Sequence, residues 1–288
     1  MTKKFILNAD GVGMSKAVNR GVLEAYEAGF LKSISLTANG KYFDEAVKTI
    51  LPKCSDLGVG IHLNITSGKS LCTDLTTLTD SESNFNNTYL KLLFNAYNPK
   101  NKDFFPQLER EFRRQIETVM SKTKVDHIDS NMHIHAIPAI FDLVCKLAKE
   151  YQINQVRTHF ERLYFIPELY KNMNFVFYKN FLKKLFLNFC SVINENAIHK
   201  YELKTNDYLL GIAYAGKMNA LAISYGIKGL KYDNITVETF IHPCRYEEGT
   251  IDNYFDEYMI ARNKKLADII KRLGYDITNY TEKNENTP

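Results

Sequence analysis

Four short apolar segments of this 288-residue chain end in polar side chains capable of acid–base or metal chemistry. At three of these ends the polar side chains are Asn8 and Asp10, His62 and Asn64, and His242. The fourth is the run 127–135, which holds three histidines and one aspartate in nine residues. Because the carboxyl ends of strands in a parallel sheet converge on one face, we expect these side chains to form one site.

Asp10 and His62 are the first candidates for chemistry. A carboxylate at the end of a buried strand needs a partner, so Asp10 is a candidate general base or metal ligand. The neighbouring glycines also fit an aspartate that stabilises a turn or caps a helix. His62 is a candidate ligand for a divalent metal, and it also fits a hydrogen-bonded core histidine. Asn8 and Asn64 are candidates for binding substrate.

The run 127–135 is the strongest local pattern. If it were one strand, alternation would direct residues 127, 129, 131, 133 and 135 to the same side. His133 and His135 are then candidate metal ligands, and Asp129 is a carboxylate that orients a metal-bound imidazole. The alternative is a polar strand end whose side chains form structural hydrogen bonds.

Two further residues follow expected strands. His242, which precedes Pro243, is a candidate general acid near neutral pH. Arg157 is a candidate for orienting an acid or binding substrate oxygens, and it also fits a structural ion-pair partner.

Strands and helices alternate from one end of the chain to the other. Apolar runs predict strands, and apolar residues at helical spacing predict a helix between a Ser15 cap and Gly29 and further helices later in the chain. The strands are expected at 5–9, 33–38, 58–63, 125–130, 155–157 and 237–241, and the later helices at 43–50, 107–121 and 140–151. This alternation predicts an α/β protein, an irregular (β/α) TIM-like barrel that forms a single domain over residues 1–288.

Two segments interrupt the alternation. Residues 67–101 are rich in Ser, Thr, Asn and Asp and predict a loop insertion that covers the site. Residues 163–203 predict a helical insertion, in which aromatic residues and lysines interleave over 177–186. We expect that helix to pack one face on the barrel and to direct its lysines to water; a membrane surface or a dimer partner is the alternative. The polar tail after Tyr280 is expected to be frayed.

Composition excludes several classes of protein. Lys and Arg number 37 against 33 for Asp and Glu, an excess too small for a nucleic-acid-binding face. No apolar stretch reaches the roughly 18 residues of a transmembrane helix. The five cysteines are irregularly spaced, as expected for reduced thiols. We therefore expect a cytoplasmic protein, with a homodimer as a reasonable further expectation.

Together the motifs carry a family likeness. NADGVGMS at 8–15, GVGIHLNITSG at 58–68, HIDSNMHIH at 127–135 and the His242-Pro243 pair resemble the YdjC-like carbohydrate deacetylases, which include chitooligosaccharide and hopanoid-biosynthesis deacetylases. The resemblance runs over 5–280 and implies a (β/α) barrel that removes an acetyl group from an N-acetylated sugar with the help of a divalent metal, Mg or Zn. It also implies that Asp10 is a base or acidic ligand, His62 a metal ligand, His242 the general acid and Arg157 an orienting group.

The chain departs from the family pattern at two places. Gly11 stands where the family carries a second aspartate, and Asn131 and Met132 stand where it tends to carry histidines. Three hypotheses follow. The first is a deacetylase in which Asp10, His62 and His133 or His135 rebuild the metal site. The second is a carbohydrate-binding protein without the metal, and the third is a metal-free acid–base enzyme that uses Asp10 and His242.

Overall fold

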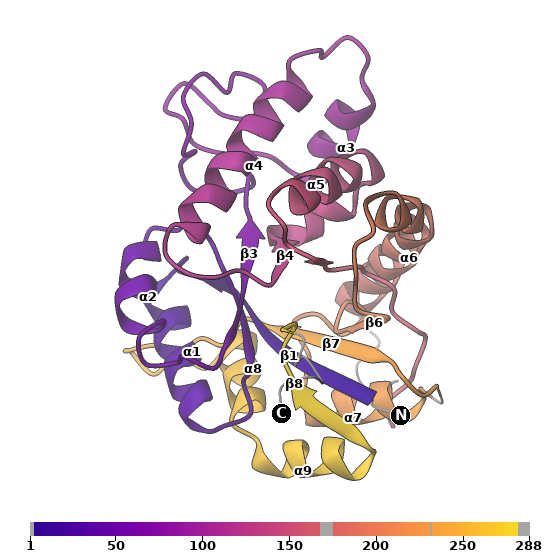
Figure 1. Ribbon diagram of the computed structural model, residues 1–288. Helices are drawn as coiled ribbons and strands as arrows, with labels where there is room; N and C mark the ends of the chain where they lie inside the picture. Colours follow the sequence, from indigo (N-terminus) through magenta and orange to yellow (C-terminus); the bar gives the residue numbers. More distant parts are fainter. Residues whose placement is uncertain (1–2, 168–174, 231, 282–288) are drawn as a thin grey trace, which may run out of the picture.

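The computed structural model describes residues 3–167, 175–230 and 232–281. Its strands, all paired in parallel, belong to one curved sheet that is flanked by helices (Figure 1). The strands are β1 (Lys3–Val12), β2 (Ser33–Leu36), β3 (Gly58–Leu63), β4 (His127–Ser130), β5 (Gln155–Val156), β6 (Tyr208–Leu210), β7 (Thr236–Ile241) and β8 (Tyr275–Thr278). The expected α/β class with a parallel sheet is confirmed.

The helices connect these strands and cover the outer face of the sheet (Figure 1). They are α1 (Lys16–Glu27), α2 (Phe43–Thr49), α3 (Tyr89–Tyr97), α4 (Phe104–Met120), the 3₁₀ segment η1 (Asn131–Ala136), α5 (Pro138–Glu150), α6 (Phe175–Tyr201), α7 (Ala220–Lys228), α8 (Asn253–Ala261) and α9 (Lys264–Arg272). The expected cap of the first helix is confirmed, because the Ser15 side chain accepts a hydrogen bond from the Val18 amide.

The expected barrel is not closed. The strand order is β5-β4-β3-β2-β1-β7-β6, so β5 and β6 are the two edges of the sheet, and β8 pairs with the first residues of β1. β5 has only two residues, and the chain between it and β6 forms the long helix α6. A strand of two residues offers few backbone N–H and C=O groups for hydrogen bonds to another strand on its free side. The result is an open half-barrel whose concave face is available for a site.

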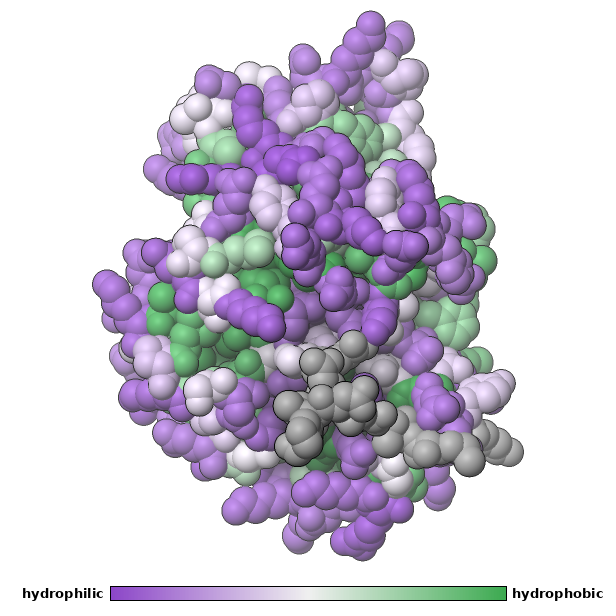
Figure 2. Space-filling model, in the orientation of Figure 1, coloured by the Kyte–Doolittle hydropathy of each residue, from purple (hydrophilic) through white to green (hydrophobic). Residues whose placement is uncertain are grey.

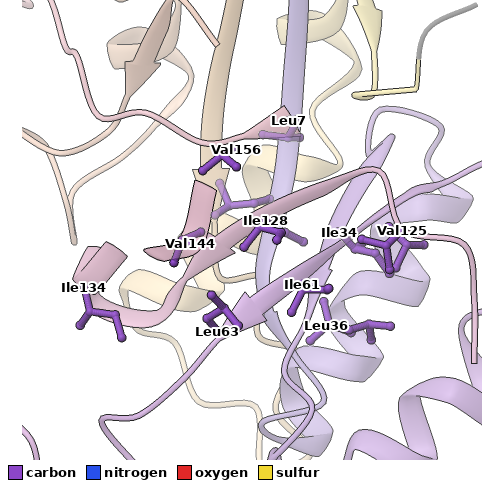
Figure 3. Packing of buried hydrophobic residues seen from close by; sticks show 14 of the residues in the cluster. Leu7, Ile34, Leu36, Ile61, Leu63, Val125, Ile128, Ile134, Val144 and Val156 are labelled. Atoms are coloured by element: carbon purple, nitrogen blue, oxygen red, sulfur yellow. The ribbon is translucent and has the colours of Figure 1, made fainter. Parts of the chain in front are cut away.

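The sheet separates an apolar outer face from a polar inner face. Ile34, Ile61 and Ile128, from three neighbouring strands, lie on the outer side with Val144 of α5 (Figure 3). Side chains alternate along a strand, so the residues between these apolar positions point to the other face. That alternation places Ser35, His62 and Asp129 on the concave side.

Two segments differ from the sequence-based expectation. The stretch 67–101 was expected to be a loop, yet it contains α3, because Thr88 caps the helix and Leu92 packs into the core. The helical insertion within 163–203 contains α6, but its lysines do not all face water, since Lys184 is buried. Residues 168–174 of this insertion and the tail at 282–288 lie outside the described residues.

Candidate active site

The concave face of the sheet carries a buried polar network. Its members come from β1, β2, β3, β4 and β7 and from the residue after β5, and nearly all of their surface is inaccessible to solvent. They are Asn8, Asp10, Ser35, His62, His127, Asp129, Arg157 and Glu238. Burial of so many polar groups is tolerated only when they satisfy one another.

Arg157 is the centre of this network. Its Nη1 and Nη2 atoms each lie 2.7 Å from an oxygen of Asp10, which is a bidentate pair. Nη2 also lies 2.8 Å from Oδ2 of Asp129, and Nε lies 2.9 Å from Oε1 of Glu238. One guanidinium therefore joins three carboxylates from three different strands.

His62 and Asp129 form a second pair. Register pairs their Cα positions on β3 and β4, and Nδ1 of His62 lies 2.7 Å from Oδ1 of Asp129. Burial opposes ionisation of Asp129, but the charge of Arg157 and the hydrogen bond from His62 outweigh it and hold the pKa of this carboxyl below its usual range. An ionised Asp129 fixes the imidazole orientation, and Nε2 of His62 is left buried without a hydrogen-bond partner in the described part of the chain.

The donor set fits a divalent cation. Asp10, His62 and Asp129 each offer a potential ligand atom, and these atoms lie within 4.8 Å of one another. Asp10 accepts three hydrogen bonds, two from Arg157 and one from Asn8, so about one of its roughly four lone-pair sites is free. A free lone pair on Asp10 and the unpartnered Nε2 of His62 are oxygen and nitrogen donors of the kind that bind Zn²⁺.

Ser35 and His127 connect the network across β3. Ser35 Oγ donates to Oδ2 of Asp129 at 2.8 Å and lies 3.0 Å from Nε2 of His127. Register places Gly60 between the strands that carry these two residues. A Cβ atom on Gly60 would lie 2.3 Å from the His127 ring, so only glycine lets this ring cross β3.

The strand expected at 125–130 ends at Ser130, as β4 does, so the alternation considered for the whole run 127–135 does not hold beyond that residue. The chain turns there into η1, with positive φ at Met132 (56°) and His133 (58°). A turn of the backbone redirects each side chain, and alternation no longer applies.

His133 and His135 consequently lie in a separate cluster around His159. The ring centroids of His133 and His135 lie 5.0 and 4.6 Å from that of His159. Nε2 of His135 lies 3.0 Å from the carbonyl oxygen of Arg157, and its Nδ1 contacts Ser130 Oγ. Among the described residues, the group whose ligand atoms converge contains His62 and not these two histidines.

The three asparagines of the region support the edge of the site. Asn8 donates from Nδ2 to Asp10 and to Ser35, each at 2.8 Å. Asn64 donates to the Ser67 carbonyl, and it also accepts a hydrogen bond from Nδ2 of Asn131 at 3.3 Å. These contacts hold the loop after β3 beside the turn after β4.

His242 lies at the solvent side of the network. Its side chain is 34% exposed, and Nδ1 lies 3.2 Å from Oε2 of Glu257 on α8. Partial burial alone would lower the pKa of His242, but the hydrogen bond and charge of Glu257, with the charge of Asp10, raise it above the ordinary histidine value. The pairing with Glu257 therefore favours the protonated form of His242, which also lies within the electrostatic influence of Asp10.

Four members of the site were not predicted from the sequence. Ser35 and Glu238 are polar residues inside apolar strands, Tyr280 donates to Glu238, and Glu257 holds His242. For Glu238 a signal existed, because a lone carboxylate in a buried strand requires a partner. For Tyr280 and Glu257 no local signal existed, since their partners are distant in the chain.

Comparison with known proteins identifies the family. A family model described as YdjC-like protein matches residues 4–273, so the chain belongs to the YdjC-like family. A carbohydrate deacetylase from Brevibacillus brevis is 40% identical over 151 residues, 52% of this chain and 57% of that protein. One from Clostridium beijerinckii is 38% identical over 52% of this chain and 58% of its own length. The chain thus spans little more than half the length of these relatives.

A solved structure shares the fold. A protein from Enterococcus faecalis V583, provisionally named a cellobiose-phosphate cleavage protein, superposes with a TM-score of 0.74 over 97% of this chain and 98% of its own. Its sequence is 20% identical, so the likeness concerns the fold alone.

Proposed function

We propose that this protein is a carbohydrate deacetylase, a hydrolase that removes the acetyl group from an N-acetylated sugar with a divalent metal ion, Mg or Zn. Family membership and the relatives named carbohydrate deacetylase support the activity. Two observations support the metal: Nε2 of His62 is buried without a hydrogen-bond partner among the described residues, and a ligand atom of His62 lies within 4.8 Å of ligand atoms of Asp10 and Asp129.

In this proposal His62 and Asp10 hold the ion, and Asp129 orients His62. A divalent ion bound there supplies Lewis-acid polarisation of the amide carbonyl and activates water. Asn8 and Arg157 fix the Asp10 carboxylate through charge-assisted hydrogen bonds, which keeps its free lone pair in one direction. If Asp10 acts as the base instead of holding the ion, that lone pair accepts the proton of the attacking water.

His242 supplies the second proton transfer. An amide nitrogen is a poor leaving group unless it is protonated as the carbon–nitrogen bond breaks. Glu257 raises the pKa of His242, which favours the protonated form, and the side chain is partly open to solvent. In this proposal His242 donates its proton to the departing sugar amine.

A second candidate function has one specific observation in its favour. Arg157 contacts both oxygens of Asp10, and a guanidinium in that position competes with a cation for the same carboxylate. If Arg157 keeps the Asp10 carboxylate and no cation displaces it, the site is free of metal. The protein is then either a carbohydrate-binding protein or an acid–base enzyme that uses Asp10 and His242.

Metal titration and acetate release separate these functions. Chelator-treated protein is titrated with Zn²⁺, Mg²⁺ and Mn²⁺ by calorimetry, and acetate release is followed with N-acetylglucosamine oligomers. The proposal expects about one ion per chain, binding that is lost in His62→Ala and retained in His199→Ala, an exposed histidine on α6. Acetate release should require the ion.

Two other outcomes would favour one of the alternative functions. A folded protein that binds none of the three ions yet releases acetate is the metal-free enzyme. One that binds the oligomers but releases no acetate under any ion is the binding protein. Either result overturns the metal-dependent deacetylase.

A further inference from the structure

Tyr280 lies at the opposite end of the buried network from His242. It follows β8, which pairs with the first residues of β1, and its side chain is buried. Figure 2 shows mostly hydrophilic surface on the side of the molecule where β8 lies in Figure 1. Tyr280 lines a cavity of about 330 Å³ with Lys4, Gln155 and Thr236, which lie at the amino ends of their strands. Tyr280 and a substrate at the carboxyl ends of the strands are therefore on opposite sides of the network.

The neighbours of Tyr280 in the chain fix its position. Nδ2 of Asn279 donates to the Asp56 carbonyl at 3.3 Å, and Oγ1 of Thr281 donates to Oδ2 of Asp126 at 3.0 Å. The Tyr280 side chain enters the fold between these two anchors. Its hydroxyl group and its ring consequently have fixed partners in the network.

The hydroxyl group of Tyr280 is linked to Asp10 by consecutive contacts. It donates a hydrogen bond to Oε2 of Glu238. The other oxygen of that carboxylate, Oε1, accepts from Nε of Arg157 at 2.9 Å. Arg157 in turn contacts both oxygens of Asp10 at 2.7 Å. Three contacts in series thus connect Tyr280 with the carboxylate that is proposed to hold the ion.

Glu238 needs this hydroxyl group because it is completely buried. Burial raises the pKa of Glu238, and the charge and hydrogen bonds of Arg157 oppose that rise. Removal of the hydroxyl group takes a donor from Oε2, and a buried carboxylate oxygen without a donor is costly. The Glu238 carboxylate would turn toward Arg157 to recover a donor, and this turn would disturb the contact of Arg157 with Asp10.

The ring of Tyr280 contacts the other half of the network. It stacks on the His127 ring, with centroids 4.2 Å apart and planes inclined by 25°. Nε2 of His127 lies 3.0 Å from Ser35 Oγ. Ser35 donates to Asp129, which holds His62. Tyr280 therefore touches both halves of the network, one through its hydroxyl group and the other through its ring.

We propose that Tyr280 is a positioning residue of the site: its hydroxyl group holds Glu238, and through Glu238 and Arg157 it fixes the direction of the Asp10 carboxylate. The kinetic consequence rests on the proposed function, whereas the effect on Arg157 does not. Loss of an outer partner that orients a ligand usually lowers metal affinity or activity about 10–100-fold. Because Tyr280 does not touch the substrate, its loss should lower kcat and leave KM nearly unchanged.

The test compares two tyrosines of the same segment. Tyr280→Phe removes the hydroxyl group and keeps the ring on His127. Tyr275→Phe is the matched control, because Tyr275 is also buried, belongs to β8, and donates to the Ile227 carbonyl at 3.3 Å and not to the network. Acetate release from N-acetylglucosamine oligomers gives kcat and KM. The assigned ¹H–¹⁵N resonance of Arg157 Nε reports the guanidinium without substrate or ion, and circular dichroism checks folding.

Tyr280→Phe should lower kcat about 10-fold or more, leave KM nearly unchanged and shift the Arg157 resonance. Tyr275→Phe should change none of the three. Glu238→Gln breaks the next contact of the same series, so Tyr280→Phe added to it should have no further effect on kcat.

A folded Tyr280→Phe protein with wild-type kcat, or with an unshifted Arg157 resonance, overturns the proposal. So does an equal loss of kcat in Tyr275→Phe, or a full additional loss when Tyr280→Phe is combined with Glu238→Gln. If the wild type releases no acetate, the proposed function fails and the resonance decides: a shift confined to Tyr280→Phe supports the positioning role, and any other result overturns it. Should Tyr280→Phe not fold, Glu238→Gln is judged by the same kcat and resonance criteria.

Discussion

Nδ1 of His62 lies 2.7 Å from Oδ1 of Asp129, and this hydrogen bond determines which imidazole nitrogen remains available. A neutral imidazole has one N–H donor and one lone pair. With the ionised Asp129 accepting from Nδ1, the lone pair belongs to Nε2, the buried atom for which the described residues supply no hydrogen-bond partner. The carboxylate thus leaves Nε2 as the atom that His62 would offer to the proposed ion.

We expect Asp129→Asn to weaken metal binding by about 10–100-fold, the usual effect of losing a carboxylate that orients a ligating histidine. Calorimetric titration with Zn²⁺ measures the change. Asp126→Asn is the matched control, because Asp126 neighbours the same strand but bonds to His127 instead of His62. Equal Zn²⁺ affinities for wild type and Asp129→Asn would show that Asp129 does not orient the ligand.

Replacement of Arg157 should destabilise the fold. Arg157→Met leaves Asp10, Asp129 and Glu238 buried without their shared cation. Removing one partner of a buried ion pair costs about 3–5 kcal/mol. Arg157→Lys should retain only part of this stabilisation, because an ammonium lacks the planar fork that contacts several carboxylates. Urea unfolding at neutral pH gives the free energies.

Arg20→Met serves as the control for that experiment. Arg20 pairs with Glu24 at the surface of α1, and both side chains are substantially exposed. An exposed pair of this kind contributes about 0.3–0.5 kcal/mol. If Arg157→Met proved as mild as Arg20→Met, the buried carboxylates would have to be satisfied without Arg157.

The elements of the fold were predictable where a local pattern specifies them. The Ser15 cap and the strand at Gly58–Leu63 depend on residues close together in the chain, and both are found as expected. Closure of the barrel was not predictable, because it depends on backbone pairing between β5 and β6, which α6 separates in the sequence. Hydrophobic alternation says nothing about which strands become edges.

The strand ends that carry the site residues were predictable from the sequence, but the contacts among those residues were not. Placing Asp10 and His62 at the same sheet edge follows from parallel strands alone, and the structure brings them together. The location of His133 depended on whether the strand continued past Ser130. The chain leaves the strand there through two residues with positive φ, Met132 and His133. Glycine is the usual residue in that conformation, and because neither position is glycine the sequence did not indicate the turn.

Gly60 supplies a test of the packing beneath the site. An added methyl group would meet atoms of the His127 ring at 2.3 Å, and that ring is held between Asp126 and Ser35. We expect Gly60→Ala to destabilise the fold by about 1–3 kcal/mol through overpacking. Thermal or urea unfolding measures the loss.

Gly229→Ala is the control for Gly60→Ala. Its added Cβ would lie 3.8 Å from the carbonyl oxygen of Tyr225, an ordinary contact, and φ is −74°. We expect it to change the free energy of unfolding by less than about 0.5 kcal/mol. A Gly60→Ala protein as stable as Gly229→Ala would mean that the His127 ring moves aside at little cost.

The pH dependence of catalysis tests the role of His242. A general acid acts in its protonated form, so activity falls as pH rises through its pKa. Glu257 raises the pKa of His242, and Glu257→Gln should therefore move the alkaline limb of kcat/KM for acetate release to lower pH. Glu248→Gln removes an equal charge from an exposed position in the same region and should leave the limb in place.

The pairing of His242 with Glu257 should also make the free energy of unfolding depend on pH. Because the folded-state pKa of His242 is raised, its pairing with Glu257 stabilises the fold fully below the ordinary histidine pKa of 6.5, and this contribution is lost as pH rises through the folded-state value. The difference in unfolding free energy between wild type and Glu257→Gln should thus be larger at pH 6 than at pH 9. If Glu257→Gln left both the alkaline limb and this difference unchanged, Glu257 would not control the protonation of His242, and another residue would have to be sought as the proton donor.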